Sequence, residues 1–306
     1  MLQKKVKLNN GKEIPIIGLG TWRINGKEYI RNSITSALEI GYRHIDTAWV
    51  YENEQDIGIV LSDILKNKKF NIKREDLFIT SKLWNTFHHN VKEGVIQTLR
   101  HLKLEYLDLY LVHWPVSFKS KNNYETDRDK EGNPILLDFD PVSVWKQMEE
   151  LVESGLTKSI GVANFGTQNL TKILENCRIK PVINQFELHP YLKQTDLQNF
   201  CTNHNIQIQS YLSLGSSDNE NTAPNLKEDP LLSKIAQNRN ITTSQLILSY
   251  LTHKNICVIP KSTNPTHIHQ NSQLIQLTDQ EVQQIESIKT EYRYVDLPSF
   301  GKDRFK

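Results

Sequence analysis

The sequence predicts an α/β fold, a single parallel (β/α)8 barrel of the TIM type, because short apolar runs alternate with amphipathic segments along the chain. The apolar runs have the length and character of buried strands. They cover residues 16–20, 44–48, 77–83, 106–113, 157–163, 182–186, 206–212 and 256–260. Between them, apolar residues recur at helical spacing, as within 29–38, 91–102 and 144–152. No break in composition divides the chain, so we expect one domain over residues 1–306.

Two features at the start of the chain refine this prediction. Asn9-Asn10-Gly11 separates two short apolar stretches, and Asn-Gly favours a tight turn, so we expect an N-terminal β-hairpin. The first barrel strand then ends as Gly18-Leu19-Gly20-Thr21-Trp22-Arg23. A doubly wound dinucleotide-binding sheet is the main alternative fold, but its first turn would require a third glycine. That glycine is missing here, which favours the barrel.

Three stretches are too polar or irregular to be barrel elements. They are residues 115–140, 215–229 and 291–306. The first follows the fourth strand and the second follows the seventh, so both are expected on the face formed by the carboxyl ends of the strands. Long loops inside a compact domain are usually lids or binding loops.

Composition and charge argue against several function classes. The chain is 38% hydrophobic and 24% charged, with a formal net charge of +2 and no basic stripe that would favour nucleic acid. No apolar run approaches the roughly 20 residues of a membrane-spanning helix, so we expect no membrane partner. Cys177, Cys201 and Cys257 match no metal-ligand spacing and indicate reduced thiols. We therefore expect a cytoplasmic protein that holds no metal.

Polar residues appear where the apolar strands end. From the second strand to the eighth they are Asp46, Lys82, His113, Asn164, Gln185, Tyr211 and Lys261. In a parallel barrel the carboxyl ends of the strands form one face, and active sites of this fold lie there. A single polar strand end is ordinary, but polar residues at successive ends predict a site on that face.

Part of this set, with Tyr51, can act as a proton donor. A tyrosine has a pKa near ~10, so a neutral Tyr51 can donate a proton but leaves a costly phenolate in a dry pocket. An ammonium from Lys82 would stabilise the phenolate and lower the pKa of Tyr51, and Asp46 would keep Lys82 charged. A neutral His113 could hydrogen-bond a carbonyl oxygen. Since the protein then lacks a nucleophile, this set implies an external hydride source.

Each of these residues also has a purely structural interpretation. Asp46 and Lys82 could form an ion pair at the barrel rim. His113 could be a satisfied core histidine, and Tyr51 could cap a helix. Only their joint placement favours catalysis. The tryptophans near the strand ends could be core aromatics, but together they suggest an aromatic substrate pocket. We expect that pocket to contain Trp22, Trp49, Trp84, Trp114 and Phe118 beside Tyr51 and His113.

Longer motifs resemble the aldo-keto reductase family. They are Gly41-Tyr42-Arg43-His44-Ile45-Asp46-Thr47-Ala48 with Tyr51, Thr80-Ser81-Lys82-Leu83-Trp84, Asp108-Leu109-Tyr110-Leu111-Val112-His113-Trp114-Pro115, Ser159-Ile160-Gly161-Val162-Ala163-Asn164-Phe165, Asn184-Gln185-Phe186-Glu187-Leu188-His189-Pro190 and Val258-Ile259-Pro260-Lys261-Ser262. They occur in the family's order over nearly the whole chain. The resemblance implies a (β/α)8 barrel, a nicotinamide cofactor across its carboxyl-terminal face, and a monomer.

The resemblance also implies roles for individual residues. Tyr51 is implied as general acid, tuned by Lys82 and Asp46, while His113 orients the carbonyl. The implied cofactor positions are Thr21, Trp22, Asp46, Asn164, Gln185, Tyr211, Leu214, Ser216, Lys261, Ser262, His267 and Asn271. Asn164 and Gln185 match the carboxamide positions, and Tyr211 matches the residue that stacks on the nicotinamide. Lys261 and Ser262 match the site of the adenosine 2′-phosphate, where an ammonium favours NADPH over NADH.

The chain departs from the family pattern at four positions. Ala163 replaces a serine that bonds the carboxamide, and Leu212 replaces a serine that contacts the pyrophosphate. His267 replaces an arginine that clamps the 2′-phosphate, and Gln270 replaces a glutamate that contacts the adenine, while Asn271 is retained. Without a permanently charged guanidinium we expect weaker NADP selectivity and a more pH-dependent affinity.

The sequence therefore predicts an NADP(H)-dependent aldo-keto reductase of the aldose or aldehyde reductase type, which reduces a small-molecule carbonyl to an alcohol. NADH is the weaker alternative cofactor. A cofactor-binding regulatory protein, similar to the potassium-channel β-subunits, is one rival, and the complete catalytic set argues against it. The other is a barrel isomerase that uses Lys82 for proton transfer. An isomerase of this kind would require a phosphate-binding glycine loop after the last two strands, and the sequence lacks one there.

Overall fold

The main sheet has eight parallel strands, hydrogen-bonded to one another in chain order over the part of the chain that is described. The computed structural model describes residues 4–216, 223–302, 304 and 305. Its barrel strands are β3 (Leu19–Gly20), β4 (His44–Asp46), β5 (Phe78–Leu83), β6 (Leu109–Val112), β9 (Ile160–Ala163), β10 (Ile183–Glu187), β11 (Gln207–Tyr211) and β12 (Cys257–Val258). The two edges meet at a parallel bridge between Ile17 and Val258, where Val258 N donates to Ile16 O over 2.9 Å. The sheet therefore closes, and the predicted barrel is confirmed.

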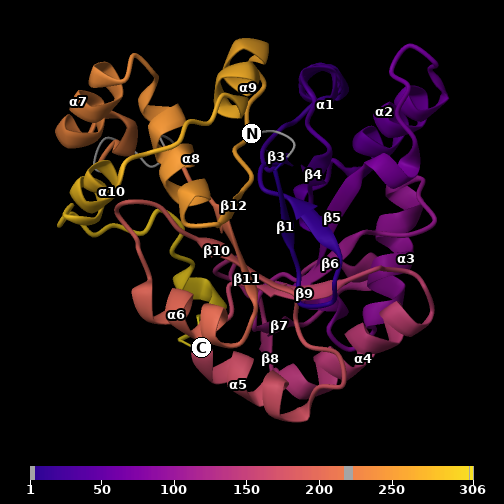
Figure 1. Cartoon of the computed structure of the whole chain (residues 1–306). Helices are drawn as coiled ribbons and strands as arrows, with labels where there is room; N and C mark the ends of the chain where they lie inside the picture. The colour runs from indigo at the N-terminus through magenta and orange to yellow at the C-terminus, as the bar shows by residue number, and fades with distance from the viewer. Residues whose placement is uncertain (1–3, 217–222, 303, 306) are drawn as a thin grey trace.

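Helices surround this sheet (Figure 1). They are α1 (Lys27–Ile40), α2 (Glu54–Lys66), α3 (Val91–Leu102), α4 (Pro141–Glu153), α5 (Thr167–Asn176), α6 (Thr195–Asn203), α7 (Pro230–Asn238), α8 (Thr243–His253), α9 (Pro265–Ser272) and α10 (Asp279–Glu286). The apolar stripe predicted for α1 packs inward through Ile30, Ile34 and Leu38, whereas Tyr29 is exposed. Local signals set the ends: the Asp140 carboxylate caps α4, and α1 stops at Gly41 with φ +115°.

The predicted N-terminal hairpin is present and closes the amino-terminal end of the barrel. Its strands are β1 (Lys5–Lys7) and β2 (Glu13–Pro15), and β1 lies in front of the barrel in Figure 1. Ile14 and Ile16 are fully buried in a cluster with Leu109, Leu111 and Ile183 from the barrel strands. Because these apolar side chains seal the interior of the barrel at this end, access to the barrel interior must lie at the opposite end.

Three irregular segments emerge at that opposite end. Residues 115–140 contain a short antiparallel pair, β7 (Ser117–Phe118) and β8 (Leu136–Leu137), so this loop is more regular than predicted. Part of the predicted 215–229 loop lies outside the described residues. The tail contains a 3-10 turn, η6 (Pro298–Phe300). Among the helices described, none combines the length and apolar character needed to cross a membrane.

Candidate active site

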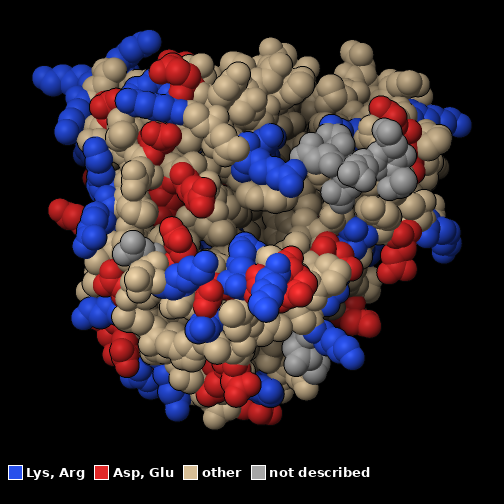
Figure 2. Space-filling view, turned by 180° about the vertical axis from the view of Figure 1, so that it is seen from behind, with Lys and Arg blue, Asp and Glu red and all other residues tan. Residues whose placement is uncertain are grey.

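A cavity of about 640 Å³ opens on the face formed by the carboxyl ends of the barrel strands. Besides strand ends, its lining includes residues 21–23 after β3, residues 212–216 after β11, and residues 294–297 and Phe300 from the tail. Figure 2 shows this face, which is hollowed near its centre and bordered by Lys and Arg side chains. The cavity thus lies where the polar strand ends predict a site.

At the floor of this cavity the Lys82 ammonium connects Asp46 to Tyr51. Lys82 Nζ donates to Asp46 Oδ1 at 2.5 Å, to Tyr51 Oη at 3.2 Å and to the Thr47 carbonyl at 2.9 Å. The Lys82 side chain is fully buried. β4 and β5 lie side by side with Asp46 opposite Thr80, and Tyr51 ends a 3-10 turn, η1 (Trp49–Tyr51), just after β4. The strand register therefore brings these three side chains to one point.

Burial and charge set the protonation states of this group. Burial lowers the pKa of Lys82, but the Asp46 carboxylate and then Tyr51 outweigh it, so the net pKa lies above its ordinary value. Burial raises the pKa of Asp46, against the opposing effect of Lys82. Burial also raises the pKa of Tyr51, and the Lys82 ammonium offsets this only in part. We expected the ammonium to bring the Tyr51 pKa down, but burial is the larger effect. Tyr51 is therefore protonated and Lys82 charged at neutral pH.

His113 contributes a neutral imidazole to the same cavity. Its ring meets that of Tyr51 edge-on with centroids 5.9 Å apart, and that of Trp84 at 5.5 Å. Burial, followed by the charges of Lys82 and His88, holds the pKa of His113 well below its ordinary value. A neutral imidazole can hydrogen-bond a carbonyl oxygen without adding a second cation beside Lys82.

A second hydrogen-bonded group lies next to Asp46, Lys82 and His113. Gln185 Nε2 donates to Asp46 Oδ2 and to Gln209 Oε1, both at 2.8 Å. Tyr211 Oη donates to Asn164 Oδ1 at 2.6 Å. Asn164 Nδ2 donates to the His113 carbonyl at 2.9 Å, and its backbone is left-handed with φ +64°, a conformation that asparagine tolerates better than most residues. These bonds fix the amide groups relative to Asp46 and His113.

This arrangement fits a nicotinamide nucleotide. Gln185 lines the cavity, and its Oε1 accepts no hydrogen bond from the described residues and is not among the buried unpaired atoms. It can therefore accept from a carboxamide. The Tyr211 ring offers an apolar surface, and Lys227 and Lys261 offer positive charge to phosphates. No group of three His, Cys, Asp or Glu side chains in the described part of the chain is suited to a metal.

The predicted cofactor residues divide into two groups. Many line the cavity: Thr21, Trp22, Asp46, Asn164, Gln185, Tyr211, Leu214, Ser216 and Lys261. Ser262, His267 and Asn271 do not. The Ser262 hydroxyl accepts from Asn264 N at 3.1 Å, His267 is an exposed residue of α9, and Asn271 is buried in the same helix. The structure does not bring these three to the cavity, and their role at a 2′-phosphate stays a prediction.

Two predicted pocket residues do not line the cavity. Trp49 donates from Nε1 to Gln97 Oε1 at 3.2 Å and packs edge-on against Phe87. Phe118 is fully buried behind Trp84, with ring centroids 5.7 Å apart. Both lie close in sequence to strand ends, which predicts a place in the pocket, but their side chains pack against neighbouring residues instead. The other predicted pocket residues line the cavity: Trp22, Tyr51, Trp84, His113 and Trp114.

The sequence interpretation missed the wall supplied by the tail. Tyr294, Val295, Asp296, Leu297 and Phe300 line the cavity, and so do Val50, Arg23 and Lys227. The tail has no helical or strand periodicity, so no pattern placed it over the barrel. The only signal was its length without regular structure, which is typical of binding loops.

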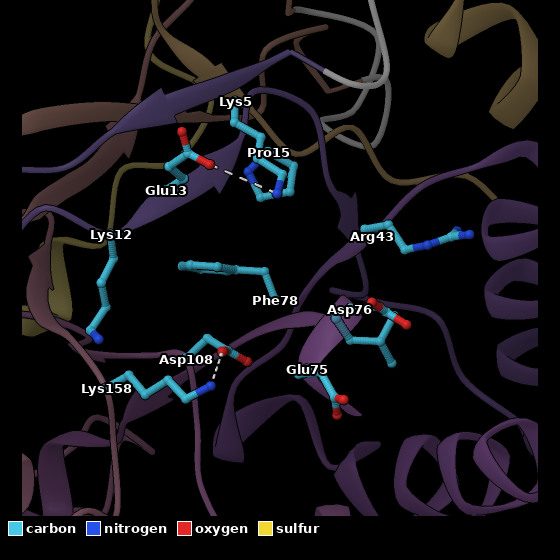
Figure 3. Close-up of a pocket in the computed structure, with 11 residues that line it drawn as sticks. Lys5, Lys12, Glu13, Pro15, Arg43, Glu75, Asp76, Phe78, Asp108 and Lys158 are labelled. Carbon is cyan, nitrogen blue, oxygen red and sulfur yellow. Dashed lines mark hydrogen bonds and ion pairs between the residues drawn. The ribbon is translucent and has the colours of Figure 1, made fainter. Parts of the chain in front are cut away.

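A second cavity, of about 610 Å³, lies at the amino-terminal end of the barrel (Figure 3). Phe78 lies in its middle, with Lys12 and Lys158 on one side and Arg43 and Asp76 on the other. Its charges are largely engaged with one another and with the backbone, as in the ion pairs between Lys158 and Asp108 and between Lys5 and Glu13. It contains none of the predicted site residues.

Comparison with known proteins agrees with this site. The family model described as "Aldo/keto reductase family" matches residues 16–290. The chain is 45% identical to the aldose reductase of Encephalitozoon cuniculi over all of both chains. It is 39% identical to aldo-keto reductase family 1 member A1 of Gallus gallus, over 95% of this chain and 90% of that protein.

A solved structure gives the same result. The aldose reductase of Schistosoma japonicum superimposes with a TM-score of 0.91 at 37% identity, over 99% of this chain and 98% of that one. Sequence and structural similarity thus extend over the barrel and over the segments that line its cavity. The chain therefore belongs to the aldo/keto reductase family and is an oxidoreductase of that family.

Proposed function

We propose that this protein reduces the carbonyl group of aldehydes and aldoses to an alcohol, with NADPH as the hydride donor and Tyr51 as the general acid. The observation that carries the proposal is the fully buried Lys82 ammonium, which donates to both Asp46 and Tyr51 at the floor of an open cavity. The similarity to proteins named aldose reductase supports the substrate class.

The residues of the chain account for the proton transfer. The nicotinamide, when bound, supplies the hydride to the carbonyl carbon. The neutral His113 imidazole hydrogen-bonds the carbonyl oxygen and orients it towards Tyr51. Tyr51 then gives its proton to that oxygen, and the resulting phenolate lies next to the Lys82 ammonium, 3.2 Å away. Asp46 holds the ammonium in place, because an unpaired buried lysine would tend to lose its proton.

The proposed cofactor preference rests on a few side chains. Lys261 lines the cavity and fits an adenosine 2′-phosphate, so we propose NADPH as the main cofactor and NADH as the weaker one. The buried Ala163 side chain has no hydrogen-bonding group, and the Leu212 side chain lines the cavity without the hydroxyl that the family resemblance implies for the pyrophosphate. Both differences weaken the binding of NADPH and of NADH, and they do not change the preference between the two.

The proposal also covers the substrate-binding surface, the cellular compartment and the oligomeric state. The aromatic side chains of Trp22, Trp84 and Trp114 form an apolar surface for the body of the substrate. The free thiols of Cys177, Cys201 and Cys257 favour a reducing compartment, and we propose a cytoplasmic, single-domain monomer.

Oxidation of NADPH and of NADH by the purified protein, with glyceraldehyde, xylose and 4-nitrobenzaldehyde, tests the proposal. We expect turnover with NADPH and slower turnover with NADH. Quenching of tryptophan fluorescence by NADPH reports binding separately. Binding without any turnover would favour the regulatory alternative, and neither binding nor turnover would contradict the proposal entirely.

A further inference from the structure

Glu187, at the carboxyl end of β10, is a fully buried carboxylate that the proposed chemistry does not use. Its Oε1 accepts from Tyr294 N at 2.6 Å and from His189 Nε2 at 3.0 Å, and its Oε2 accepts from Val295 N at 2.9 Å. Two of the three donors are thus consecutive backbone amides of the tail, more than a hundred residues away in the chain. The Glu187 side chain therefore binds the tail at residues 294 and 295, where the tail reaches the cavity.

The tail segment that starts at this point forms one wall of the cavity. Val295, Asp296, Leu297 and Phe300 all line it. At the far end of the segment the Phe300 ring packs against Trp114, with centroids 5.4 Å apart, and against Trp84 at 6.2 Å. Residues 295–300 are therefore held at two places, by Glu187 at one end and by aromatic packing at the other.

Tyr294 connects the anchored point to the loop that follows β11. Its hydroxyl donates to the Pro224 carbonyl at 2.6 Å. Its ring lies directly on Gly215, so close that a Cβ added to Gly215 would be 2.9 Å from Tyr294 Cζ. Moving the Tyr294 backbone would disturb these contacts as well. The hydrogen bonds to Glu187 therefore influence the geometry of more than one side of the cavity.

Glu187 is in the wrong place for a direct chemical role. It is absent from the cavity lining, whereas Gln185, two residues earlier in β10, is part of it. A buried carboxylate that loses its donors is strongly destabilised, so the tail amides and the carboxylate hold each other in place. The group acts through the tail rather than on a reacting atom.

We propose that Glu187 is a positioning residue for substrate selection. Its carboxylate fixes the start of segment 295–300 over the cavity and so sets the space for the part of an aldehyde beyond its carbonyl. The proposal rests on the carbonyl reductase function above. Under this proposal, the buried hydrogen bonds between Glu187 and the tail limit the size of substrate that the cavity accepts. They lie away from the residues that transfer the proton.

Glu187→Gln is the test, because the amide keeps the size of the side chain but can no longer accept at both positions. Glu149 gives a matched control. It is also buried, and its Oε1 accepts from two consecutive backbone amides, Arg178 N at 2.6 Å and Ile179 N at 2.8 Å, but it does not line the cavity. Glu149→Gln therefore removes the same charge from a buried carboxylate that accepts from backbone amides, without reaching the tail.

In Glu187→Gln we expect KM for 4-nitrobenzaldehyde to rise about tenfold, as for one lost charge-assisted hydrogen bond. KM for the smaller glyceraldehyde should rise less, and kcat should stay within about twofold because the proton donor is unchanged. Glu149→Gln should leave both KM values as they are. Equal changes in KM in the two variants, or a loss confined to kcat, would overturn the proposal.

Amide hydrogen exchange provides a readout that needs no turnover, and its first comparison is made within the wild-type protein. In the wild-type protein the amides of Tyr294 and Val295 should exchange much more slowly than those of the exposed tail residues that follow, and in Glu187→Gln they should lose this protection. If they exchange as fast as their neighbours in the wild type, the anchor is wrong, even if the variant does not fold. If they are protected but the wild-type protein oxidises no NADPH, it is the proposed reductase function that fails.

Discussion

The two ends of the barrel carry the same three residue types in different geometries. At the carboxyl-terminal end, Lys82 Nζ is 2.5 Å from Asp46 and donates to the Tyr51 hydroxyl. At the amino-terminal end, Lys158 Nζ is 3.4 Å from Asp108 and lies over the ring face of Tyr106, 3.9 Å from its centroid.

Burial is the second difference between these clusters. The Lys82 side chain has no exposed surface, whereas that of Lys158 is 39% exposed, and Asp108 has a second cation in Arg74 at 2.8 Å. An ammonium over an aromatic face stabilises packing but cannot stabilise a phenolate oxygen, whereas one that donates to the hydroxyl can. Residue types alone therefore do not make an active site. The atom that the ammonium contacts determines whether the cluster can stabilise a phenolate.

The largest expected effect is on turnover at the tyrosines. Tyr51→Phe should lower kcat by roughly 100- to 10,000-fold, because it removes the general acid and leaves the cavity shape intact. Tyr106→Phe should leave kcat unchanged, since its ring face remains under Lys158. Steady-state NADPH oxidation measures both, and fluorescence quenching should show that NADPH binding persists in Tyr51→Phe. Substantial turnover in that variant would remove Tyr51 from the acid role.

The lysines should differ next, in stability. Lys82→Met leaves the buried Asp46 without its cation and should cost about 3–5 kcal/mol of the free energy of unfolding. Lys158→Met should cost less than about 1 kcal/mol, because the pair is partly exposed and Arg74 still holds Asp108. Urea unfolding of both variants measures the difference. Equal losses would mean that burial does not distinguish the two ion pairs.

Buried histidines give a third comparison. Burial lowers the pKa of His44 to about 3, and burial holds the pKa of His113 well below its ordinary value. Below about pH 6.5 these imidazoles bind a proton in the unfolded protein but not in the folded protein. The free energy of unfolding therefore falls as pH falls. By pH 5 His44 should account for roughly 2 kcal/mol of loss, and His113 should add a loss in the same direction.

The test is urea unfolding at several pH values for His44→Gln and His113→Gln. Each substitution should flatten the pH dependence to a similar extent, because both imidazoles are buried. Only His113→Gln should reduce turnover, since His44 lies at the start of β4 and does not line the cavity. A wild-type stability that does not change over this pH range would contradict the burial argument.

The smallest expected effect is on cofactor affinity. His267 is exposed on α9, at the position where the family resemblance implies an arginine, and an imidazole lacks the permanent charge of a guanidinium. His267→Arg should therefore raise NADPH affinity roughly threefold, as expected for one exposed charge pair. NADH affinity should stay as it is, because NADH has no 2′-phosphate. Fluorescence quenching measures both affinities, and an unchanged NADPH affinity in His267→Arg would exclude a role for this position.

The order of strands and the site at their carboxyl ends could be predicted because each depends on local patterns. Apolar runs of strand length give the barrel, and Asp46, Lys82 and His113 each end such a run. Trp49 and Phe118 lie outside the cavity lining, because position in sequence does not tell on which side of a turn a side chain packs. The position of the tail over the cavity could not be predicted, because Glu187 binds it through backbone amides. Backbone amides are the same for nearly every residue type and produce no pattern in the sequence.

The sequence by itself determined the barrel, the hairpin at its amino-terminal end and the residue types of the site, because the periodicity of apolar residues and the chemistry of strand ends are local properties of the chain. Only the tertiary structure decided which of two Asp–Lys–Tyr clusters is buried with its ammonium on a hydroxyl. It also decided that burial raises the pKa of Tyr51 in spite of Lys82 and that the tail forms a wall of the cavity. These properties depend on how much water each group loses and on contacts between distant segments, and both arise only when the chain is folded.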